Sequence, residues 1–293
     1  MAPRKDATYK DALGVTIHYH VWAHPSPKAV VQLVHGLGEH ALRYERLADA
    51  LVAAGYEVWA DEHRGHGQTG LDQWGGDASR IGRLGKGGHP ATVEAIKAFG
   101  RLIKAARPSI PFILLGQSWG SFIAQLLLDA QPREYDAVVL TGSAIRTLSG
   151  MNGGDLNARH GRTVANPTGY EWLSRDPEVV AAAAADPLMT KARILRLFGL
   201  RDTLRLLGRP RRGIAEERDV PVLLLVGEDD PLGGERSVRR LAEAYITRSG
   251  LTDVTVIVYD GARHEVFHET NRGEVVADLL AWLDARVGAP SGG

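Results

Sequence analysis

Gly116-Gln117-Ser118-Trp119-Gly120 lies between a short apolar run at 112–115 and an amphipathic segment at 118–130. A G-x-S-x-G between a strand and a helix is the signature of a nucleophile elbow, a sharp turn that presents a serine hydroxyl. The glycines two positions before and after the serine relieve crowding of the backbone in such a turn. The alternative is a serine that caps the helix between two packing glycines. The strand and helix on either side favour Ser118 as a nucleophile.

Short runs rich in Val, Leu and Ile alternate with longer amphipathic segments along most of the chain. Strands are expected at 29–34, 57–61, 112–115, 137–141, 222–226 and 254–259, and helices at 44–54, 92–106, 118–130, 235–247 and 274–286. Strands that alternate with helices build βαβ units and a parallel sheet. The run 16–22 alternates polar and apolar residues and is expected to form part of an antiparallel edge. The predicted fold class is α/β, with a mostly parallel central sheet and helices on both faces.

Residues 144–219 interrupt this alternation. They contain no convincing strand, but they include an amphipathic segment at 191–207. About seventy residues between two core strands are too many for a loop. We therefore expect a helical cap, or lid, over a core formed by residues 1–143 and 220–288, with a flexible tail at 289–293.

The composition is that of an ordinary globular protein. The chain has 293 residues, of which 44% are hydrophobic and 24% charged, and it contains no cysteine. These proportions exclude disorder as the main state, and the lack of cysteine excludes a disulfide scaffold, thiol catalysis and thiolate metal sites. The 35 basic residues balance the 35 acidic ones, so no overall positive field favours nucleic-acid binding.

Two stretches bear on the cellular location. Residues 1–11 are charged and lack the apolar core of a signal peptide, which favours a cytoplasmic protein. Residues 109–128 carry no formal charge and approach the length of a membrane span. Pro111 and the glycines of 116–120 interrupt that stretch, so a short strand, a turn and a helix explain it better.

A serine nucleophile needs a general base, and the histidines near the end of the chain supply candidates. His264 follows the expected strand 254–259, in the region where catalytic groups collect in open α/β sheets. His268 lies one turn further on and is better explained as a helix or loop residue. His264 is therefore the expected base.

The base needs an acid that orients it, and the expected strand 222–226 is followed by three carboxylates. These are Glu228, Asp229 and Asp230. Adjacent carboxylates can also form a solvated turn or cap the next helix, but one of the three is expected to face the imidazole. The resulting order of serine, acid and histidine is that of the α/β hydrolases.

An oxyanion hole requires backbone N–H groups aimed at the oxygen that becomes negative. One donor is expected from the residue after the nucleophile, Trp119. The other is expected from the turn His35-Gly36-Leu37-Gly38 after the first predicted parallel strand, although an ordinary glycine turn is the alternative.

Two further runs carry a resemblance to a known family. They are His35-Gly36-Leu37-Gly38-Glu39-His40 with Arg43-Tyr44, and Asp61-Glu62-His63-Arg64-Gly65-His66-Gly67-Gln68. Together with 116–120, 227–230 and 261–265, they resemble the monoacylglycerol lipase and lysophospholipase group of α/β hydrolases, which is of the serine aminopeptidase S33 type. The similarity covers nearly the whole chain outside the insertion and implies the α/β-hydrolase fold.

The resemblance also implies roles for individual residues. The acid in this family is the last residue of G-x-x-D, which matches Asp230, and the second oxyanion donor matches Leu37. Family enzymes contact glycerol through residues that match Glu39 and Arg43, and their helical cap forms an acyl-chain tunnel. This chain departs from the family in having Gln117 and Trp119 beside the serine, where G-H-S-M-G is commoner. It also has Phe267 where the mammalian enzyme has a glycerol-contacting histidine, and His268 stands one position late.

The predicted activity is hydrolysis of carboxylic monoesters with an apolar acyl chain, through an acyl-enzyme and without a cofactor. The cap residues expected to contact that chain are Leu188, Ile194, Leu195 and Phe198. The same residues could instead pack the cap against the core. Short-chain, aromatic or xenobiotic monoesters remain open as substrates, as do a peptidase or acyltransferase activity and a non-catalytic ligand-binding role.

The remaining histidines and the basic residues of the cap complete the expectations. The histidines at 35, 40, 63 and 66 lack an accompanying carboxylate cluster at helical spacing, so no metal site is expected.

Residues 191–212 contain eight basic side chains against the single acid Asp202. Such a segment can lie on a membrane or micelle surface, and the alternative is a solvated arginine face. The expected partner is a small ester, with no nucleic acid; the sequence does not indicate an oligomeric state.

Overall fold

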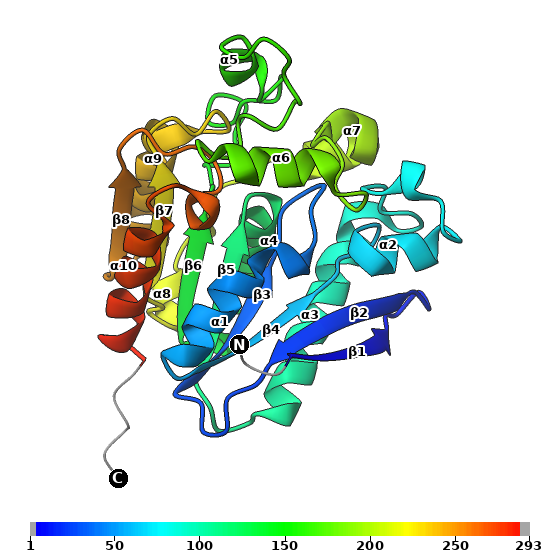
Figure 1. The fold of residues 1–293 in the computed structure, drawn as a ribbon. Helices are drawn as coiled ribbons and strands as arrows, with labels where there is room; N and C mark the ends of the chain where they lie inside the picture. Colours follow the sequence, from blue (N-terminus) through cyan, green and yellow to red (C-terminus); the bar gives the residue numbers. More distant parts are fainter. Residues whose placement is uncertain (1–3, 288–293) are drawn as a thin grey trace.

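The computed structural model describes residues 4–287, so the predicted tail at 289–293 lies outside the described residues. It has a single eight-stranded sheet in the order β1-β2-β4-β3-β5-β6-β7-β8 (Figure 1). The strands are β1 (Arg4–Lys10), β2 (Thr16–Trp22), β3 (Ala29–Val34), β4 (Tyr56–Asp61), β5 (Phe112–Gln117), β6 (Ala137–Thr141), β7 (Val222–Gly227) and β8 (Val254–Tyr259). The strands β3 to β8 run parallel, whereas β2 pairs antiparallel with both β1 and β4. This arrangement confirms the predicted fold class.

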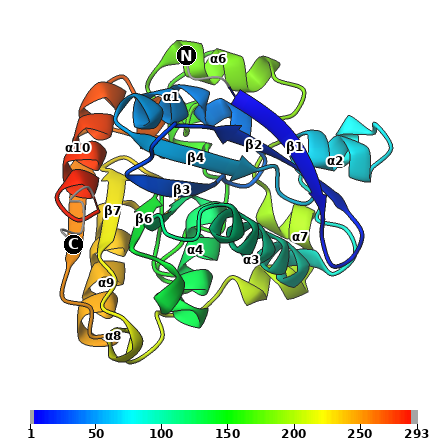
Figure 2. The same ribbon diagram turned by 90° about the horizontal axis from the view of Figure 1, so that it is seen from below.

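Ten α-helices occur in residues 4–287. They are α1 (Glu45–Ala53), α2 (Gly67–Gln73), α3 (Gly88–Ala106), α4 (Trp119–Ala130), α5 (Ala158–Gly161), α6 (Pro177–Ala185), α7 (Ile194–Arg205), α8 (Ile214–Glu217), α9 (Gly234–Thr247) and α10 (Arg272–Asp284). The helices α1 and α10 cover one face of the sheet, and α3, α4 and α9 cover the other (Figure 2). No helix among these residues is long and apolar enough to cross a bilayer.

The central strands are apolar throughout because both faces of the sheet are covered. Side chains of a strand alternate between the two faces. In β5, Ile113 and Leu115 therefore join the core under α1 and α10, while Phe112 and Leu114 join the core under α3, α4 and α9. All four are buried, and the strand carries the serine turn at its carboxyl end.

Outside residues 144–219, the strand β1 and the helix α2 are not predicted from the sequence. The edge strand β1 is charged and largely exposed, so it lacks the apolar pattern of a buried strand, and it pairs with β2 along its whole length. The short helix α2 begins in a glycine-rich stretch after β4 and contains two glycines of its own. Glycine disfavours helices, so tertiary contacts rather than local propensity stabilise α2.

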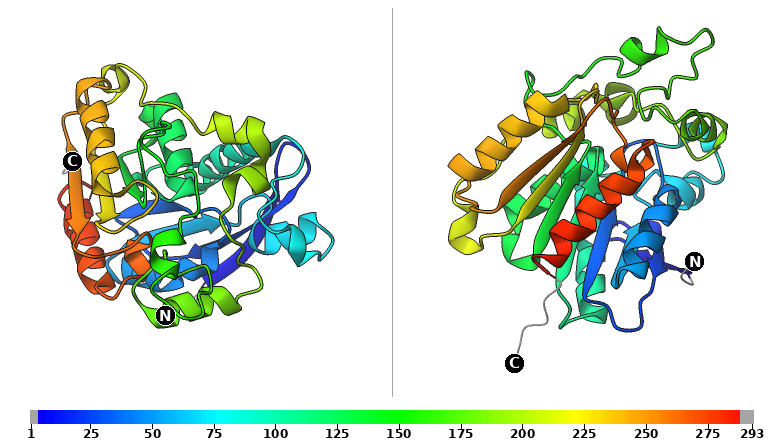
Figure 3. Two further views of the ribbon diagram at one scale, coloured as in Figure 1. Left: turned by 90° about the horizontal axis from the view of Figure 1, so that it is seen from above. Right: turned by 60° about the vertical axis from the view of Figure 1, so that its left-hand side comes forward.

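The segment between β6 and β7 contains α5, α6, α7 and α8 and no strand. The helices α5, α6 and α7 lie above the carboxyl ends of the parallel strands, whereas α8 lies near the opposite end of the sheet (Figures 1 and 3). Helix α7 is interrupted at Gly199, which adopts φ 74° and ψ 171°. A positive φ favours glycine over other residues, so Gly199 divides α7 into two short pieces.

Candidate active site

Ser118 occupies the turn between β5 and α4, with φ 55° and ψ −121°. It is the only non-glycine residue with positive φ among residues 4–287. The turn is held because the Ser118 N–H donates to the carbonyl of Thr141 at the end of β6, at 2.9 Å. A Cβ at Gly120 would collide with the backbone of β3, and one at Gly116 would lie 2.5 Å from the Gly120 carbonyl oxygen. The two motif glycines are thus required by close backbone approach.

His264 and Asp230 are hydrogen-bonded to each other. Asp230 Oδ1 lies 2.9 Å from His264 Nδ1, and both side chains are buried. Asp230 Oδ1 also accepts the backbone N–H of Leu232 at 2.9 Å, which fixes the carboxylate. Since carboxylates only accept, Nδ1 donates and Nε2 of a neutral His264 carries the lone pair.

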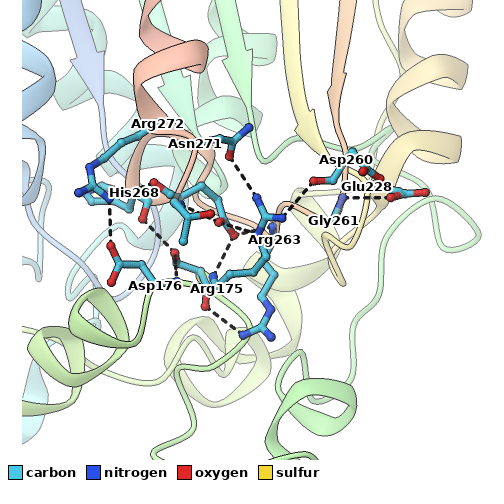
Figure 4. Close-up of polar contacts among 12 residues, drawn as sticks. Arg175, Asp176, Glu228, Asp260, Gly261, Arg263, His268, Asn271 and Arg272 are labelled. Atoms are coloured by element: carbon cyan, nitrogen blue, oxygen red, sulfur yellow. Dashed lines mark hydrogen bonds and ion pairs between the residues drawn. The ribbon is translucent and has the colours of Figure 1, made fainter.

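The neighbouring carboxylates lie elsewhere. Asp229 pairs with Arg159 at 3.0 Å, and Glu228 accepts the backbone N–H of Gly261 at 3.0 Å (Figure 4). His268 Nε2 lies 2.9 Å from the carbonyl oxygen of Arg43 rather than facing the serine. The structure therefore brings Asp230, and neither of the adjacent acids, to His264.

His264 Nε2 is buried and has no hydrogen-bond partner within residues 4–287. Ser118 and His264 line the same pocket, although no hydrogen bond joins them. Hydrogen bonds of catalytic groups are often long or poorly aligned before substrate binds. The arrangement thus leaves the lone pair of His264 Nε2 in the pocket that Ser118 also lines.

The charges around His264 alter its pKa. Burial lowers the pKa of the imidazole, whereas the adjacent Asp230 carboxylate raises it through its charge and its hydrogen bond. Glu265 and Glu39 raise the pKa further, so that it lies above the usual value for histidine.

Gln117, which replaces the commoner histidine of the motif, connects the serine turn to the loop that carries the base. Its Nε2 donates to the His264 carbonyl at 3.2 Å, and its Oε1 accepts from the Thr141 hydroxyl. From the sequence alone, Gln117 is only a departure from the family pattern. Its structural role depends on contacts between β5, β6 and the loop after β8, which no local pattern shows.

The backbone N–H groups of Leu37 and Trp119 make no hydrogen bond within the described part of the chain. A Cβ at Gly36 would lie 3.0 Å from the Cβ of Ser118, so glycine allows the loop at 35–38 to approach the serine closely. The Gly36 N–H itself donates to Glu39 Oε1 at 2.5 Å. Leu37 and Trp119 thus offer free donors beside Ser118, on the loop and at the first turn of α4 respectively.

Glu39 and Arg43 belong to a buried ion cluster. Arg43 Nη1 donates to Glu39 Oε2 at 2.6 Å, and the guanidinium makes two bonds to Glu265, at 2.5 and 2.7 Å. Burial alone would raise the pKa of Glu265, but the Arg43 charge holds it well below its usual range. Glu39 and Glu265 line the pocket of Ser118, and Arg43 lies behind them. Glu265 is not among the site residues predicted from the sequence, although it directly follows His264.

The histidines of the two family runs brace the loops around the serine. The rings of His35 and His63 stack with centroids 3.7 Å apart, and the His63 N–H donates to His35 Nε2 at 3.1 Å. Burial lowers the pKa of His35 well below its usual value and that of His66 to about 3. Within residues 4–287, no group of three or more histidine, aspartate or glutamate side chains is placed to hold a metal ion.

Two cavities lie against the segment between β6 and β7, and Ser118 lines the inner one. The inner cavity is mainly apolar and has a volume of about 20 Å³. It is lined by Leu37, Ser118, Trp119, Phe122, Leu156, Trp172, Ala192, Ile194, Leu206 and Leu232. The outer cavity has a volume of about 620 Å³ and is lined by residues 152–157, Pro167, Gly169, Trp172 and residues 191–196. Leu156, Trp172, Ala192 and Ile194 line both. The inner cavity thus shares a wall with the outer one.

The four cap residues singled out from the sequence lie in different places. Ile194 lines both cavities, and Leu195 lines the outer cavity and is 60% exposed. The Phe198 ring packs on Trp119, with centroids 5.0 Å apart. Leu188 is half-buried and is not among the residues that line these cavities.

The segment 171–176 is anchored to the loop after β8, which carries His264. The Glu265 N–H donates to the Leu173 carbonyl at 2.8 Å, and Arg263 Nη1 donates to the Glu171 carbonyl at 2.6 Å. Figure 4 shows the surrounding ionic contacts, in which Arg272 pairs with Asp176 at 2.9 Å. Arg175 extends over the same loop and binds the carbonyl of Asp260 and the side chains of Glu269 and Asn271 (Figure 4).

A second segment, 186–190, is anchored to the loop that carries Leu37. Asp186 Oδ2 lies 2.8 Å from His40 Nε2, and the Thr190 N–H donates to the Gly38 carbonyl at 2.8 Å. Gly38 has φ +79°, and a Cβ there would collide with the Thr190 carbonyl oxygen. Segment 171–176 thus contacts the loop of His264, and segment 186–190 contacts the loop of Leu37.

Comparison with known proteins identifies a family and several relatives of this chain. The family model described as serine aminopeptidase, S33 matches residues 25–271. A monoacylglycerol lipase of Mycolicibacterium smegmatis is 33% identical, covering 96% of this chain and 97% of its own length. The monoglyceride lipase of Mus musculus is 27% identical, covering 92% of this chain and 86% of its own length.

Solved structures share the fold. A carboxyl esterase from Bacillus coagulans, solved with glycerol, superposes with a TM-score of 0.80 at 23% identity, covering 98% of this chain and all of the esterase chain. A soluble variant of monoglyceride lipase from Saccharomyces cerevisiae, solved with a substrate analogue, gives 0.71 at 19% identity, covering 98% and 99% of the two chains. The sheet and its flanking helices are those of an α/β hydrolase.

Proposed function

The chain belongs to the serine aminopeptidase S33 family of α/β hydrolases and is a carboxylic ester hydrolase, and from this premise we propose that it cleaves monoesters with an apolar acyl chain through Ser118, His264 and Asp230. Monoacylglycerols are the substrate class that the names of several relatives suggest. The observation that carries the proposal is the Asp230–His264 hydrogen bond, which leaves Nε2 free on the pocket that holds Ser118.

In the first half of the proposed reaction, Ser118 Oγ attacks the ester carbonyl while His264 Nε2 removes the serine proton. Asp230 holds the tautomer that leaves Nε2 unprotonated and stabilises the imidazolium that forms. The carbonyl oxygen becomes negative between the N–H groups of Leu37 and Trp119. Collapse of the tetrahedral intermediate breaks the ester bond as the imidazolium returns the proton to the departing alcohol.

In the second half, water attacks the acyl-enzyme. His264 removes a proton from the water, and the same N–H groups stabilise the second oxyanion. The ester bond to Ser118 breaks, the serine regains its proton, and a carboxylic acid is released. Every proton transfer uses a group of this chain, so no cofactor is required.

The inner cavity supports an apolar acyl chain. Phe122, Leu206 and Leu232 line it from different parts of the chain, and Ile194 adds a side chain from the start of α7. Burying apolar surface contributes about 25 cal/mol per Å², so each methylene enclosed there favours binding by about 0.8 kcal/mol. Because the inner cavity has a volume of only about 20 Å³, a medium or long chain would continue from it along the shared wall into the outer cavity of about 620 Å³. Medium and long chains are the proposed acyl groups on this path.

The pocket that contains Glu39 and Glu265 supports an alcohol group with hydroxyls. Both carboxylates line it together with Ser118 and can accept hydrogen bonds from glycerol. Arg43 bonds to both carboxylates and so fixes their orientation. Arg43 thereby acts on glycerol through Glu39 and Glu265.

The same carboxylates favour one second candidate, a peptidase that binds an amino terminus. Two carboxylates against the single guanidinium of Arg43 leave one negative charge close to Ser118. A substrate ammonium group would pair with that charge. An aminoacyl amide therefore belongs in the test of function.

Residues 144–219 are proposed to cap the active site and to contact a membrane or micelle. Within residues 4–287, Lys191, Arg193, Arg196, Arg201, Arg209 and Arg212 have no side-chain ion pair or hydrogen bond. The only pairs in that stretch are Arg205 with Asp202 and Arg211 with Glu217. The leucines at 195, 200 and 204 are at least half exposed beside these cations. Exposed apolar and unpaired basic groups together are typical of peripheral membrane contact.

The test is a hydrolysis profile of the whole protein on monoacylglycerols, lysophospholipids and p-nitrophenyl esters with acetyl, octanoyl and palmitoyl groups, and on aminoacyl p-nitroanilides. We expect octanoyl or palmitoyl monoesters to give the highest kcat/KM and the anilides to be inert. A preference for acetyl or aryl esters would overturn the acyl-chain proposal, and cleavage of the anilides would favour the peptidase.

A further inference from the structure

The outer cavity carries unpaired positive charge. Lys191, Arg193 and Arg196 line it and are exposed, and none of them has an ionic partner in residues 4–287. The carboxylate among the lining residues is that of Asp155, whose Oδ1 accepts the backbone N–H of Asn157. Three cations against one carboxylate leave a net positive charge in a concave site.

The pocket at Ser118 carries the opposite charge. Glu39 and Glu265 line it, and their two charges face the single guanidinium of Arg43. Both carboxylates are almost fully buried, so their charges are screened less by solvent and salt than charges at the surface. The carboxylate product released beside Ser118 therefore lies next to an excess of negative charge, whereas the outer cavity offers it cations.

From this charge distribution we infer that the outer cavity binds the carboxylate of an amphiphile, namely the alkyl carboxylate that ester hydrolysis releases. The inference rests on the proposed function. Hydrolysis breaks the acyl C–O bond, transfers the oxygen of water to the acyl carbon, and yields an acid that loses its proton at neutral pH. A monoacylglycerol and glycerol are uncharged, so the cations discriminate the carboxylate product from that substrate.

The shared wall allows the alkyl chain to remain in apolar contact while the carboxylate is held outside. Leu156, Trp172, Ala192 and Ile194 line both cavities, so a chain that leaves the inner cavity passes along the same side chains. The carboxylate then reaches Lys191, Arg193 and Arg196 at the far side of that wall. A long acyl product therefore binds more tightly than acetate, through its tail as well as its charge.

The first measurement is binding of sodium decanoate and of 1-decanol to the Ser118→Ala protein by calorimetry. The second is inhibition by the same two compounds of p-nitrophenyl butyrate hydrolysis by the protein with an intact Ser118. The site variant is the triple change Lys191→Gln, Arg193→Gln and Arg196→Gln. The matched control is Arg201→Gln, Arg209→Gln and Arg212→Gln, which removes the same charge from the same segment but from residues that do not line the outer cavity.

We expect the site variant to weaken decanoate binding and inhibition about tenfold, since each exposed ion pair contributes modestly. The control should remain within about twofold of the parent, and 1-decanol should bind all three proteins alike. Raising salt should weaken decanoate but not 1-decanol. Equal weakening in both triple variants, or decanoate binding unchanged by the site variant, would overturn the inference.

The calorimetric arm separates this inference from the proposed function. If the parent protein hydrolyses no ester but the site variant alone loses decanoate affinity, the carboxylate site stands and the proposed hydrolysis fails. If esters are hydrolysed but decanoate binding does not depend on the three cations, hydrolysis stands and the carboxylate site fails.

Discussion

The indole ring of Trp172 lies over the imidazole of His264, with centroids 4.6 Å apart and an angle of 36° between the planes. Its backbone carbonyl accepts the His264 N–H at 3.4 Å, so both parts of Trp172 contact the same residue. Trp172 also lines the inner and outer cavities. Trp172, which lies in the segment between β6 and β7, thus covers the imidazole of the proposed base.

Trp172→Ala is expected to reduce acyl-chain selectivity. The indole provides part of the apolar wall of the inner cavity, and its removal takes contact area from a long chain but not from an acetyl group. We expect the ratio of kcat/KM for octanoyl over acetyl p-nitrophenyl esters to fall by about tenfold, equivalent to about 1.4 kcal/mol. Trp172→Phe, which keeps an aromatic wall, should retain most of the ratio. An unchanged ratio in Trp172→Ala would contradict the proposed chain path.

Ser118→Ala is expected to reduce ester hydrolysis by at least about 10³-fold while leaving the fold intact, because the nucleophile is lost. Ser121 provides a matched control, since it lies one turn along α4 and its hydroxyl is hydrogen-bonded to the Ser118 carbonyl at 2.6 Å. A fluorophosphonate probe should label the parent and Ser121→Ala but not Ser118→Ala, as read by intact mass. Labelling that survives in Ser118→Ala would identify another nucleophile.

Asp230→Asn is expected to reduce kcat/KM by about 10⁴, the magnitude seen when a serine protease loses the carboxylate that fixes its histidine tautomer. Asp229→Asn should change kcat/KM by less than about threefold, because Asp229 only pairs with Arg159 at a partly exposed position. Steady-state kinetics on one ester compares the two variants. Comparable losses in both would show that the acid has been assigned to the wrong carboxylate.

The acid limb of the pH profile should lie above the usual pKa of histidine. His264 must be neutral to accept the serine proton, and Asp230, Glu265 and Glu39 raise its pKa in the free enzyme. Activity is therefore lost as pH falls through this raised value. Glu39→Gln removes one of these charges and should move the midpoint of kcat/KM to lower pH, whatever its effect on the maximum. The control Glu274→Gln, at the start of α10, should leave the midpoint in place.

Membrane contact through the cap should depend on its unpaired arginines. Arg201→Glu with Arg209→Glu is expected to abolish flotation with vesicles of anionic phospholipid at low salt, and high salt should release the parent protein. Arg101→Glu with Arg133→Glu makes the same charge change at exposed positions outside residues 144–219 and should leave flotation unchanged. If the parent fails to float at low salt, the cap has no such role.

The sequence predicts those elements whose local residue pattern matches their burial in the fold. The parallel strands are apolar because both faces are buried, and the serine turn requires glycines because β3 approaches it closely. The edge strand β1 was missed since its charged residues face solvent, and only pairing with β2 makes it a strand.

The site residues also divide into those that the sequence predicts and those that only the structure shows. The order along the chain located Ser118 and His264, and the family resemblance selected Asp230 among three adjacent acids. Glu265 follows His264 directly in the sequence, but its place in the pocket depends on its ion pair with Arg43, which lies more than two hundred residues earlier in the chain. Contacts of that kind depend on the tertiary fold.

The two anchored segments have a consequence for engineering by lid truncation. Segment 171–176 holds the backbone of the histidine loop, and segment 186–190 holds the loop of Leu37, through Thr190 and Gly38. Excising the lid would therefore remove two supports, one for the loop of the base and one for the loop of the oxyanion donor Leu37, in addition to uncovering the serine. A minimal scaffold without a lid should be catalytically dead, whereas exchange of residues 194–207 alone keeps both braces and changes only what lies between them.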